Sequence, residues 1–376
     1  MGFAIGILAT RGVNRPATAK DPFPGRTRTF QEMSRVARKQ GVEVVVFSPR
    51  AVDKRRSRVL GWSCVPGRGW VQRYHPLPPV IYNRIANRRA EGRARVQDLL
   101  SWFKAQGVTV FNPRFLDKWE VYEALQSDPD LKGNVPETLL YTDPGQALDA
   151  LRRWGTVFCK PRRGSLGTGI AALKLTRPGR VSICRNGVKV GTSVLRVSSP
   201  GGVHRWVEQY LRPYRYCLQK GVDLATVQGR RFDIRTLVQK DGQGRWRFTG
   251  AAARVAGRGQ LTTHVPRGGR RMPLRAALTH ALGNPQKAEQ KVHELAELSQ
   301  AVAACLEGRQ GELYGEFSLD VGLDKDGKLW VLEANAKPFR FDEADIRRRG
   351  FERLIAFARH LVEGEAKDAN GTKGCC

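Results

Sequence analysis

The segment Gly315–Arg340 reads GEFSLDVGLDKDGKLWVLEANAKPFR and predicts a β-hairpin. Residues Asp324–Gly327 supply the turn, and apolar side chains alternate with other residues on both sides of it. In such a hairpin, Asp320 on the first strand lies beside Glu333 and Asn335 on the second. The hairpin therefore brings polar side chains from both strands close together.

These polar side chains are suited to a hard cation. Glu333 and Asn335 are two positions apart and so point to one face of their strand. Two carboxylates and one amide oxygen are the ligands that Mg²⁺ prefers, with substrate phosphates completing the shell. We expect a metal site formed by Asp320, Glu333 and Asn335. For the hairpin alone, a solvated strand pair with ordinary surface acids explains the same residues.

The composition indicates a globular protein of two or three domains. The chain has 376 residues, 41% of them hydrophobic, and no apolar run approaches the roughly 20 residues of a membrane span. The start, MGFAIGILATRG, lacks a basic n-region and predicts a buried strand rather than a signal peptide. The 7 cysteines form no CxxC pair, which favours a reducing, cytoplasmic location over disulfides or a zinc site.

The net charge is +30 and is unevenly distributed, since residues 1–112 hold 21 Lys and Arg against 6 Asp and Glu. Such a field attracts polyanions, including nucleic acid. The basic residues are dispersed, however, with short clusters at Lys54–Arg58 and Arg84–Arg95, and no nucleic-acid-binding motif is present. We therefore do not expect nucleic acid as the main partner. An Arg-rich genome or an anionic assembly around the protein explains the charge equally well.

The first 50 residues predict a parallel α/β unit. A strand at 2–10, a helix at Thr29–Gln40 and a strand at Val42–Phe47 follow one another, and Asn112–Pro113 marks a boundary. Further predicted helices are Glu91–Gln106, Phe115–Leu125, Val203–Leu211, Gln286–Gly308 and Asp342–Glu363. Further predicted strands are Val80–Tyr82, Val108–Phe111, Val157–Lys160, Gly169–Lys174, Tyr216–Gln219, Asp233–Gln239 and Arg245–Ala253, with a strand pair in Val181–Arg196. Ser63–Trp70 and His264–Arg275 are predicted loops.

A glycine-rich loop follows the strand that ends at Lys160. The segment Pro161–Gly169 reads PRRGSLGTG, and its small residues allow backbone N–H groups to surround an anion. It matches neither the Walker A loop nor the dinucleotide-binding fingerprint. A plain hairpin loop on a basic protein is the alternative interpretation.

Further basic residues favour a phosphate ligand. Lys118 follows Asp117 at a helix start, where the helix dipole does not favour a cation. Asp233 and Arg235 lie on one face of a strand, and we expect them to form a charge pair. Arg254 ends a strand after three alanines and is suited to phosphate or carboxylate oxygens. Taken singly, each arginine also fits a surface ion pair.

The order of these elements resembles the ATP-grasp superfamily of carboxylate–amine ligases. A helix lysine, a strand lysine with a glycine-rich loop, a D-x-R strand, a strand arginine and a D…E-x-N set follow in that order. The chain is more closely similar to the endospore-coat-associated YheC/YheD group over about residues 1–360. The phrases carrying this similarity are NPRFLDKW at Asn112–Trp119, GRRFDIRTLVQ at Gly229–Gln239, LEANAKP at Leu332–Pro338, VIYNR at Val80–Arg84 and CLQKGVDL at Cys217–Leu224.

The resemblance implies an α/β (α+β) architecture. An N-terminal pre-ATP-grasp α/β domain is expected at 1–112 and an ATP-grasp module at 113–363, with a mobile lid subdomain at about 155–218. Residues 364–376 are expected to form a disordered tail that ends in Cys375 and Cys376. The role of that cysteine pair is left open.

The resemblance also implies roles for individual residues. Lys118 and Lys160 would contact the α- and β-phosphates of ATP. The hinge that reads adenine would lie at Gln219–Val222, with Asp223 near the ribose; Glu208–Leu211 is an alternative hinge. Arg235 and Arg254 would face the γ-phosphate or an acyl-phosphate intermediate. The glycine-rich loop residues that would close over the phosphates are Gly164, Ser165, Gly167, Thr168 and Gly169, and the hinge comprises Gln219, Lys220, Gly221 and Val222.

The implied function is an ATP- and Mg²⁺-dependent ligase. A carboxylate would be activated as an acyl phosphate and attacked by an amine or a similar nucleophile, in a protein connected with spore formation. A non-catalytic spore-coat component with the same fold is the alternative, and a polyanion-binding protein is a third. The basic first domain suggests an acidic peptide or protein as acceptor, and spore-coat proteins are candidate partners. The roles of Lys337 and of HVPRGGRR at His264–Arg271 are left open.

Overall fold

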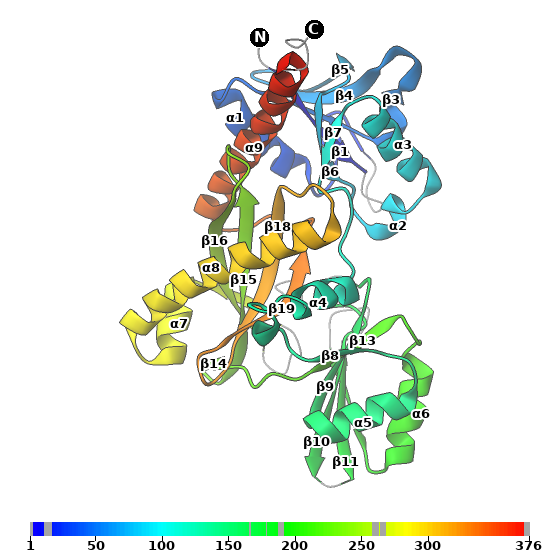
Figure 1. The fold of residues 1–376 in the computed structure, drawn as a ribbon, viewed down its shortest axis with the longest axis vertical. Coiled ribbons are helices and arrows are strands. Elements are labelled where there is room, and N and C mark those ends of the chain that lie inside the picture. Colours follow the sequence, from blue (N-terminus) through cyan, green and yellow to red (C-terminus); the bar gives the residue numbers. More distant parts are fainter. Residues whose placement is uncertain are drawn as a thin grey trace.

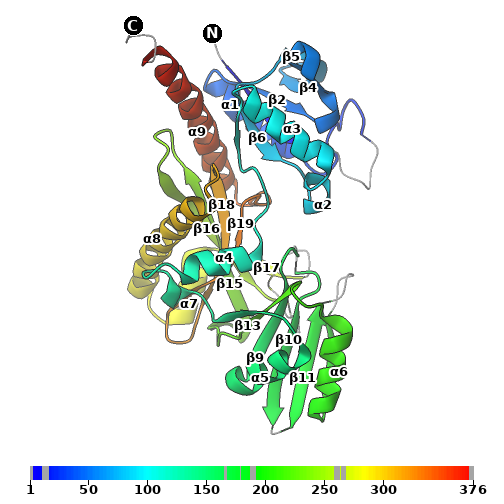
Figure 2. The ribbon, with the colours of Figure 1, turned by 45° about the vertical axis from the view of Figure 1, so that its right-hand side comes forward.

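The computed structural model describes residues 3–10, 17–164, 167–177, 179–186, 192–257, 263 and 268–371. Three sheets follow one another along the long axis of the molecule (Figures 1 and 2). The first sheet lies at the end that holds both termini, and the second lies at the opposite end. The third sheet, built from the C-terminal half of the chain, lies between them.

The first sheet has the order β3-β4-β2-β1-β6-β7, with β5 paired to β4. Strands β1, β2, β6 and β7 are parallel, whereas β3, β4 and β5 pair in antiparallel fashion. The bounds are β1 Ala4–Ala9, β2 Glu43–Phe47, β3 Val52–Asp53, β4 Arg58–Val65, β5 Gly69–Pro76, β6 Val80–Arg84, β7 Thr109–Phe111, α1 Thr27–Lys39, α2 Arg88–Glu91 and α3 Ala94–Ala105.

Alternation along β1 assigns its side chains to two cores. Ile5 and Ile7 pack with α1 and with the C-terminal helix α9 (Ala344–Gly371), while Leu8 packs with α3. The parallel α/β unit predicted for the N-terminal segment is confirmed. The predicted loop at Ser63–Trp70 is wrong, because β4 and β5 form a hairpin there. Pro66 and Gly67 break the strand pattern only over the turn.

The second sheet is antiparallel, with the order β12-β11-β10-β9-β13-β8. Helices α5 and α6 cover one of its faces through a core that includes Leu151, Val157, Val203 and Leu218. The bounds are β8 Thr138–Leu140, β9 Thr156–Pro161, β10 Ala171–Arg177, β11 Arg180–Asn186, β12 Thr192–Val197, β13 Tyr216–Lys220, α5 Pro144–Trp154 and α6 Pro200–Tyr210. The helix α5 and the strand β8 were not predicted.

The third sheet is also antiparallel, with the order β17-β16-β15-β18-β19 and β14 paired to β15. Its largest core lies against α4, α7 and α8. The bounds are β14 Thr226–Val227, β15 Arg230–Lys240, β16 Trp246–Val255, β17 Arg270–Met272, β18 Glu316–Leu323, β19 Leu329–Asn335, α4 Lys118–Gln126, α7 Leu274–Leu282 and α8 Pro285–Gln310. Strands β18 and β19 form the hairpin predicted for Gly315–Arg340.

Two sequence predictions differ from the structure near the C-terminal half. The predicted loop His264–Arg275 contains β17 and the start of α7, while its first four residues, HVPR, lie outside the described residues. The helix α9 extends to Gly371, beyond its predicted end at Glu363 and into the predicted disordered tail. Cys375 and Cys376 lie outside the described residues.

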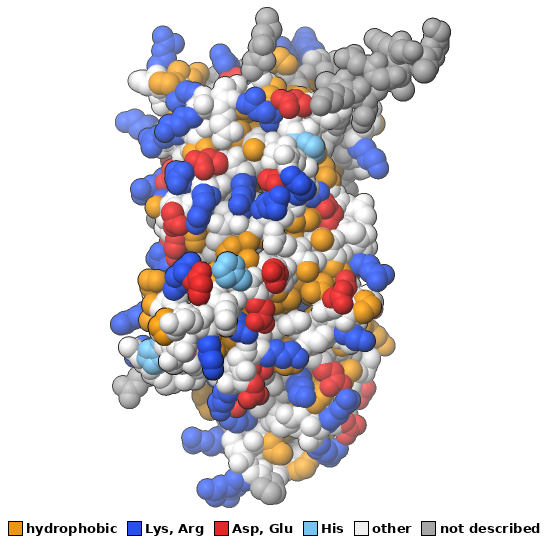
Figure 3. Space-filling model, turned by 60° about the vertical axis from the view of Figure 1, so that its left-hand side comes forward, with side chains coloured by type: hydrophobic (Ala, Val, Ile, Leu, Met, Phe, Trp, Pro, Cys, Tyr) orange, Lys and Arg blue, Asp and Glu red, His pale blue; other side chains and the backbone are white. Residues whose placement is uncertain are grey.

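Basic side chains are spread over the face shown in Figure 3, where acidic side chains lie among them along the whole length of the molecule. Among the described residues on this face, the basic side chains form no continuous stripe of the kind that tracks a nucleic-acid backbone. Within the part of the chain that the structure describes, no helix combines the length and the apolar character needed to cross a bilayer.

Asn112 links β7 of the first sheet to the hairpin of the third. It is fully buried at φ +53°, a left-handed conformation that asparagine tolerates better than most residues. Its Nδ2 donates to the carbonyl oxygens of Glu316 (2.9 Å) and Ala336, and its Oδ1 accepts from the N–H of Gly315 (2.8 Å). One side chain therefore ties the start of β18 to the end of β19.

We predict that Asn112→Ala lowers the free energy of unfolding by about 3 kcal/mol, because three buried backbone groups lose their partner. Chemical and thermal denaturation followed by circular dichroism measure the change. Asn112→Gly is the matched variant, since it accepts the positive φ without making the hydrogen bonds. If the glycine variant is as stable as the wild type, the side-chain hydrogen bonds contribute nothing and this account is wrong.

Candidate functional site

One face of the third sheet collects most of the predicted site residues. Along β15, the even-numbered side chains from Phe232 to Val238 enter the core beside α8, so the odd-numbered ones point to the opposite face. Cross-strand pairing places Arg235 opposite Asp320 of β18, and Asp320 opposite Glu333 of β19. The same pairing places Arg254 of β16 on this face. We call it the site face.

A β-bulge at Leu332 sets the position of Glu333. Val321 pairs with Val331, whereas Asp320 pairs with Glu333, so Leu332 is an extra residue in β19. Val331 enters the core, and the bulge turns Glu333 toward the site face instead. The carbonyl oxygen of Leu332 accepts a hydrogen bond from Nζ of Lys160 at 3.2 Å. Lys160 belongs to β9, so this contact joins the second sheet to the third.

Arg254 lies between two carboxylates. Its Nε and Nη2 donate to both oxygens of Asp233, at 2.8 and 2.6 Å, and Nη2 lies 2.9 Å from Oδ2 of Asp320. Burial alone would lower the pKa of Arg254, but Asp320 and Asp233 outweigh it and the pKa is raised. Oδ2 of Asp233 also accepts from the hydroxyl of Thr263 at 2.5 Å. The arginine is thus held charged and fixed in position.

Lys118 and Lys160 supply positive charge from the other side of the site. Nζ of Lys118 lies 3.2 Å from Oε1 of Glu333 and donates to the carbonyl of Gly164 at 3.0 Å. Nζ of Lys160 donates to Oε1 of Gln219 at 2.5 Å. Burial lowers the pKa of Lys160 to about 8, although Glu333 acts in the opposite direction.

Asp117 anchors the glycine-rich loop to α4. As N-cap residue it accepts from the N–H of Trp119 at 2.9 Å, and it pairs with Nε of Arg162 (3.0 Å) and Nε of Arg163 (3.2 Å). Burial would raise the pKa of Asp117, but these partners lower it. Arg162 and Arg163 of the glycine-rich loop are therefore paired with an acid.

A pocket lies between the second and third sheets and holds about 800 Å³ of space, including the part open to solvent. The second sheet and the chain segment after it contribute Phe158, Lys160, Ile170, Gln219, Lys220, Val222 and Leu224 to the lining, and the third sheet contributes Arg231, Asp233, Asp320, Leu332 and Glu333, with Thr263. A ligand here would contact lysines on one side and carboxylates on the other.

The residues present fit a magnesium ion held partly by a substrate. Asp320 and Glu333 are cross-strand neighbours, and Asn335 follows on the same face, opposite Ser318. Among the described residues, no group of three or more His, Cys, Asp and Glu side chains could hold a metal alone. Two carboxylates and an amide suit Mg²⁺ that takes its remaining ligands from phosphates and water.

Comparison with known proteins identifies the family. Residues 107–361 match the family described as YheC/D like ATP-grasp. The chain belongs to this family. It is 28% identical over 324 residues to endospore coat-associated protein YheD of Bacillus subtilis (strain 168), covering 85% of this chain and 69% of that protein. YheC of the same strain is 25% identical over 312 residues, covering 82% and 84%.

The structure of D-alanyl-alanine synthetase A from Vibrio cholerae O1 biovar eltor str. N16961 matches with a TM-score of 0.54 at 12% identity. The match covers 96% of this chain and 97% of that chain. The predicted family and the α/β (α+β) ATP-grasp fold are therefore confirmed.

In this ATP-grasp chain, the two candidate hinges lie in different places. Gln219, Lys220 and Val222 line the pocket, and the N–H groups of Lys220 and Gly221 donate to the carbonyls of Glu137 and Thr156. The alternative, Glu208–Leu211, ends helix α6 on the outer face of the second sheet. The side chain of Asp223 does not line the pocket between the sheets. It is 79% exposed and pairs with Lys325 at 2.7 Å.

The glycine-rich loop is described in part. Gly167 and Gly169 have φ +66° and +75°, conformations that favour glycine, and Thr168 is exposed. Ser165 lies outside the described residues. Of the predicted loop residues, Gly164 makes the contact with Lys118 described above.

The predicted charge pair between Asp233 and Arg235 is wrong. Asp233 instead pairs with Arg254, its direct neighbour across the β15–β16 ladder. Arg235 donates to the carbonyl of Phe339 at 2.7 Å and lies over the ring of Phe341 at 4.5 Å. Burial lowers its pKa, and Asp320 opposes this effect. Residues two apart on a strand share a face, but the cross-strand partner is closer.

Lys337 contacts Glu91 at the end of helix α2 and does not line the pocket between the second and third sheets. Its Nζ pairs with Oε1 of Glu91, which also accepts from Asn83 (3.2 Å), while Oε2 of Glu91 accepts from the N–H of Phe115 (3.0 Å). Burial lowers the pKa of Lys337 to about 8, against the effect of Glu91. Glu91 was not singled out in the sequence, because nothing in its local pattern reveals a partner 246 positions away.

We predict that Lys337→Met destabilises the protein by about 3–5 kcal/mol, because it leaves the carboxylate of Glu91 buried without a cation. The double variant Glu91→Gln with Lys337→Met should recover most of this loss. Urea unfolding measures both changes. The control is Lys325→Met, which breaks an exposed pair and should cost less than about 1 kcal/mol. Equal losses in Lys337→Met and Lys325→Met would contradict the importance of the buried pair.

Proposed function

We propose that this protein is an ATP- and Mg²⁺-dependent ligase that activates a carboxylate as an acyl phosphate for attack by an amine or a similar nucleophile. The observation that carries the proposal is the convergence of opposite charges between two sheets. Lys118 and Lys160 approach from one side, and Asp320, Glu333 and Arg254 approach from the site face. Such a set of charged side chains can bind a nucleoside triphosphate together with its metal ion.

The lysines would hold the phosphates of ATP. Lys160 lies inside the pocket, and Lys118 is fixed between Glu333 and the carbonyl of Gly164 at the glycine-rich loop. Phosphate oxygens would take the place of these partners. The loop Gly164–Gly169 would then close over the phosphates and exclude water, which would otherwise hydrolyse an acyl phosphate.

The hinge at Gln219–Val222 would bind adenine through its backbone, since Gln219, Lys220 and Val222 line the pocket where β13 leaves the second sheet. Asp223 would reach the ribose only if it left Lys325. The second sheet and its helices, at about 155–218, would act as the mobile lid of an ATP-grasp module at 113–363. Residues 1–112 would form the pre-ATP-grasp domain, and its charge favours an acidic peptide or protein as acceptor.

Asp320, Glu333 and Asn335 would hold Mg²⁺, which when bound neutralises charge on the phosphates. Arg254 and Arg235 would neutralise charge on the γ-phosphoryl group as it moves. A carboxylate oxygen of the acid substrate attacks the γ-phosphorus, the bond to the β-phosphate oxygen breaks and ADP leaves. The amine nitrogen then attacks the acyl carbon, phosphate departs and the nitrogen loses a proton.

A structural role in the spore coat is the second candidate function. It is favoured by the names of the two Bacillus subtilis relatives, both called endospore coat-associated. Under this alternative the fold would be kept without chemistry, because a fold does not by itself establish an activity. Coat association and ligase activity are also compatible, and coat proteins would then be partners or substrates.

We predict that the wild type binds Mg·ATP in isothermal titration calorimetry and that Asp320→Asn and Glu333→Gln each weaken this binding at least about tenfold, or about 1.4 kcal/mol. Without Mg²⁺ the wild type should bind as weakly as the variants. Asp326→Asn, an exposed acid in the turn of the same hairpin, is the matched control and should bind normally. A wild type that binds no nucleotide rejects the ligase proposal and leaves the structural role.

We predict a pH dependence that arises from Lys160. Its ammonium group is charged below its pKa of about 8, and phosphates favour the charged form. The affinity for Mg·ATP should therefore be constant below about pH 7 and fall as the pH rises above about 8. Lys160→Arg, which stays charged, should remove this fall. Titrations between these pH values test the prediction, and the same slope in both proteins would contradict it.

A further inference from the structure

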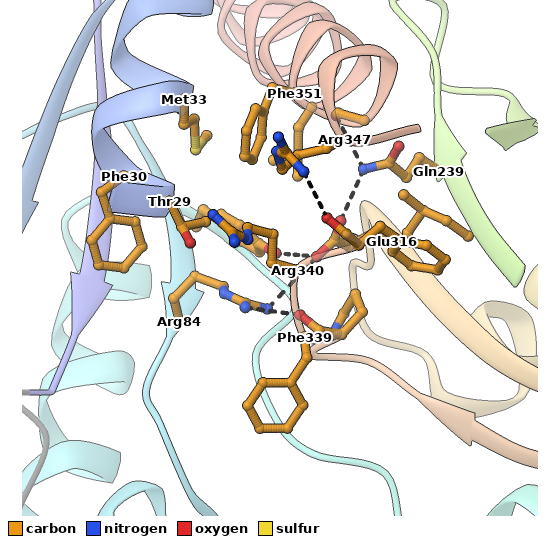
Figure 4. Close-up of a pocket in the computed structure, with 16 residues that line it drawn as sticks. Thr29, Phe30, Met33, Arg84, Gln239, Glu316, Phe339, Arg340, Arg347 and Phe351 are labelled. Atoms are coloured by element: carbon orange, nitrogen blue, oxygen red, sulfur yellow. Dashed lines mark hydrogen bonds and ion pairs between the residues drawn. The ribbon is translucent and has the colours of Figure 1, made fainter. Parts of the chain in front are cut away.

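A second pocket lies between α1, α9 and the segment after β19 (Figure 4). It offers about 520 Å³, including its opening to solvent. Its apolar lining comes from both helices, the loop and strand β15: Phe30, Met33, Leu237, Pro338, Phe339, Phe341, Phe351 and Leu354. Its polar lining includes Arg84, Arg340, Arg347, Gln239 and Glu316. The pocket is therefore amphipathic.

This pocket lies on the same face of the third sheet as the candidate phosphate site. Glu316 and Asp320 are four positions apart on β18, and Gln239 and Arg235 are four apart on β15, opposite them. The two sites are thus separated by about 13 Å along the strands. The loop at 338–341 links them, because Arg235 contacts its Phe339 and Phe341 while the same residues line the pocket.

Guanidinium groups outnumber carboxylates around the pocket. Glu316 already accepts hydrogen bonds from the hydroxyl of Tyr82 and from Nε2 of Gln239 at 2.9 Å. Nη2 of Arg84 donates to the carbonyl of Pro338 at 2.9 Å, and its Nη1 lies 3.7 Å from Glu316 without a hydrogen bond to any described residue. Burial and the charge of Arg84 together lower the pKa of nearby Arg26 to about 9.

Two further arginines share one acid. Arg340 lies 3.6 Å and Arg347 lies 2.7 Å from Glu32 of α1. The carboxylates of Glu32 and Glu316 therefore face three guanidinium groups in the lining, and Arg26 adds a fourth close by. A ligand that enters this apolar pocket meets excess positive charge, which favours a negatively charged group on the ligand.

We propose that this pocket binds the apolar, negatively charged end of the acid substrate, and that this substrate is a peptide whose C-terminal residue is apolar. This identification rests on the proposed function. An extended chain covers about 3.3–3.6 Å per residue, so four residues span the separation between the two sites. A side-chain carboxylate three residues before the C-terminus would then reach the guanidinium of Arg235, which lies opposite Asp320. The C-terminal carboxylate would face Arg84 and Arg340.

Phe339 is placed where it could pack against the apolar C-terminal side chain of the peptide. It is 60% exposed at the pocket although it is a large aromatic residue, and Figure 4 shows its ring apart from the other apolar side chains. A free aromatic side chain beside arginines is typical of a ligand contact, since it provides contact area at a small entropic cost.

The test is calorimetric titration of the full chain with N-acetyl-Glu-Ala-Ala-Phe bearing a free C-terminus. The C-terminal amide, the peptide ending in Ser and N-acetyl-Phe alone are the comparison ligands. The free Phe peptide should bind at least about tenfold more tightly than each of them. If N-acetyl-Phe binds as tightly as the free Phe peptide, the inference that a peptide spans both sites is wrong. If the amide binds as tightly, the inference that the arginines bind the C-terminal carboxylate is wrong.

Two variants locate the binding. Arg340→Gln and Phe339→Ser, both at partly exposed positions, should each weaken peptide binding about tenfold or more. Two matched controls should bind normally. Arg348→Gln changes an exposed arginine that follows Arg347 on α9, and Tyr74→Ser changes an exposed aromatic residue on β5. Weakening by the controls equal to that of the pocket variants would overturn the proposal.

Titration with Mg·ATP on the same samples separates the two proposals. A wild type that binds nucleotide but not the Phe peptide overturns the pocket assignment and leaves the ligase proposal standing. A wild type that binds the Phe peptide through Phe339 and Arg340, but no nucleotide, supports the pocket as a peptide site and overturns the ligase proposal.

Discussion

The extra residue in β19 is the constraint on which the candidate site depends. In an uninterrupted strand, Val331 and Glu333 would point to the same face, and the acid would enter the apolar core beside α8. The bulge at Leu332 separates them, so Val331 stays in the core while Glu333 faces Asp320. The carbonyl of the bulged residue then accepts from Lys160, so the same irregularity orients an acid and attaches the second sheet.

The charges of the site are held by one another. Arg254 lies between Asp233 and Asp320, and Lys118 contacts Glu333, so these five charged groups have partners of opposite sign. Lys160 and Arg235 are held instead by neutral acceptors, which include Gln219 and the carbonyl of Phe339. Isolated buried charges would be costly, whereas paired ones stay ordered. In the proposed reaction, phosphate oxygens would pair with the lysines and arginines, and the metal would bind the carboxylates that these cations now contact. Substrate binding would then exchange ion pairs instead of creating unpaired charge.

The first sheet positions the site through a few long-range contacts. Asn112 holds both strands of the hairpin, Glu91 pairs with Lys337 just after β19, and Tyr82 donates to Glu316 at the start of β18. The last of these contacts lies in the second pocket, since Tyr82 and Glu316 both line it. The arginines of that pocket come from β6, α9 and the loop between β19 and α9. The N-terminal unit therefore does more than add charge, since it helps to shape the surface on which a substrate would lie.

Local patterns in the sequence determined the hairpin, the parallel N-terminal unit, the long helices and the set of lysines and acids that resembles ATP-grasp proteins. Alternation and turn residues act over a few positions, which is why these features could be read directly. Only the tertiary structure decided that Asp233 pairs with Arg254, that Lys337 contacts Glu91 and that Asp223 turns to Lys325. Those partners are set by strand register, one β-bulge and the packing of distant segments, and such contacts leave no signal in the neighbouring sequence.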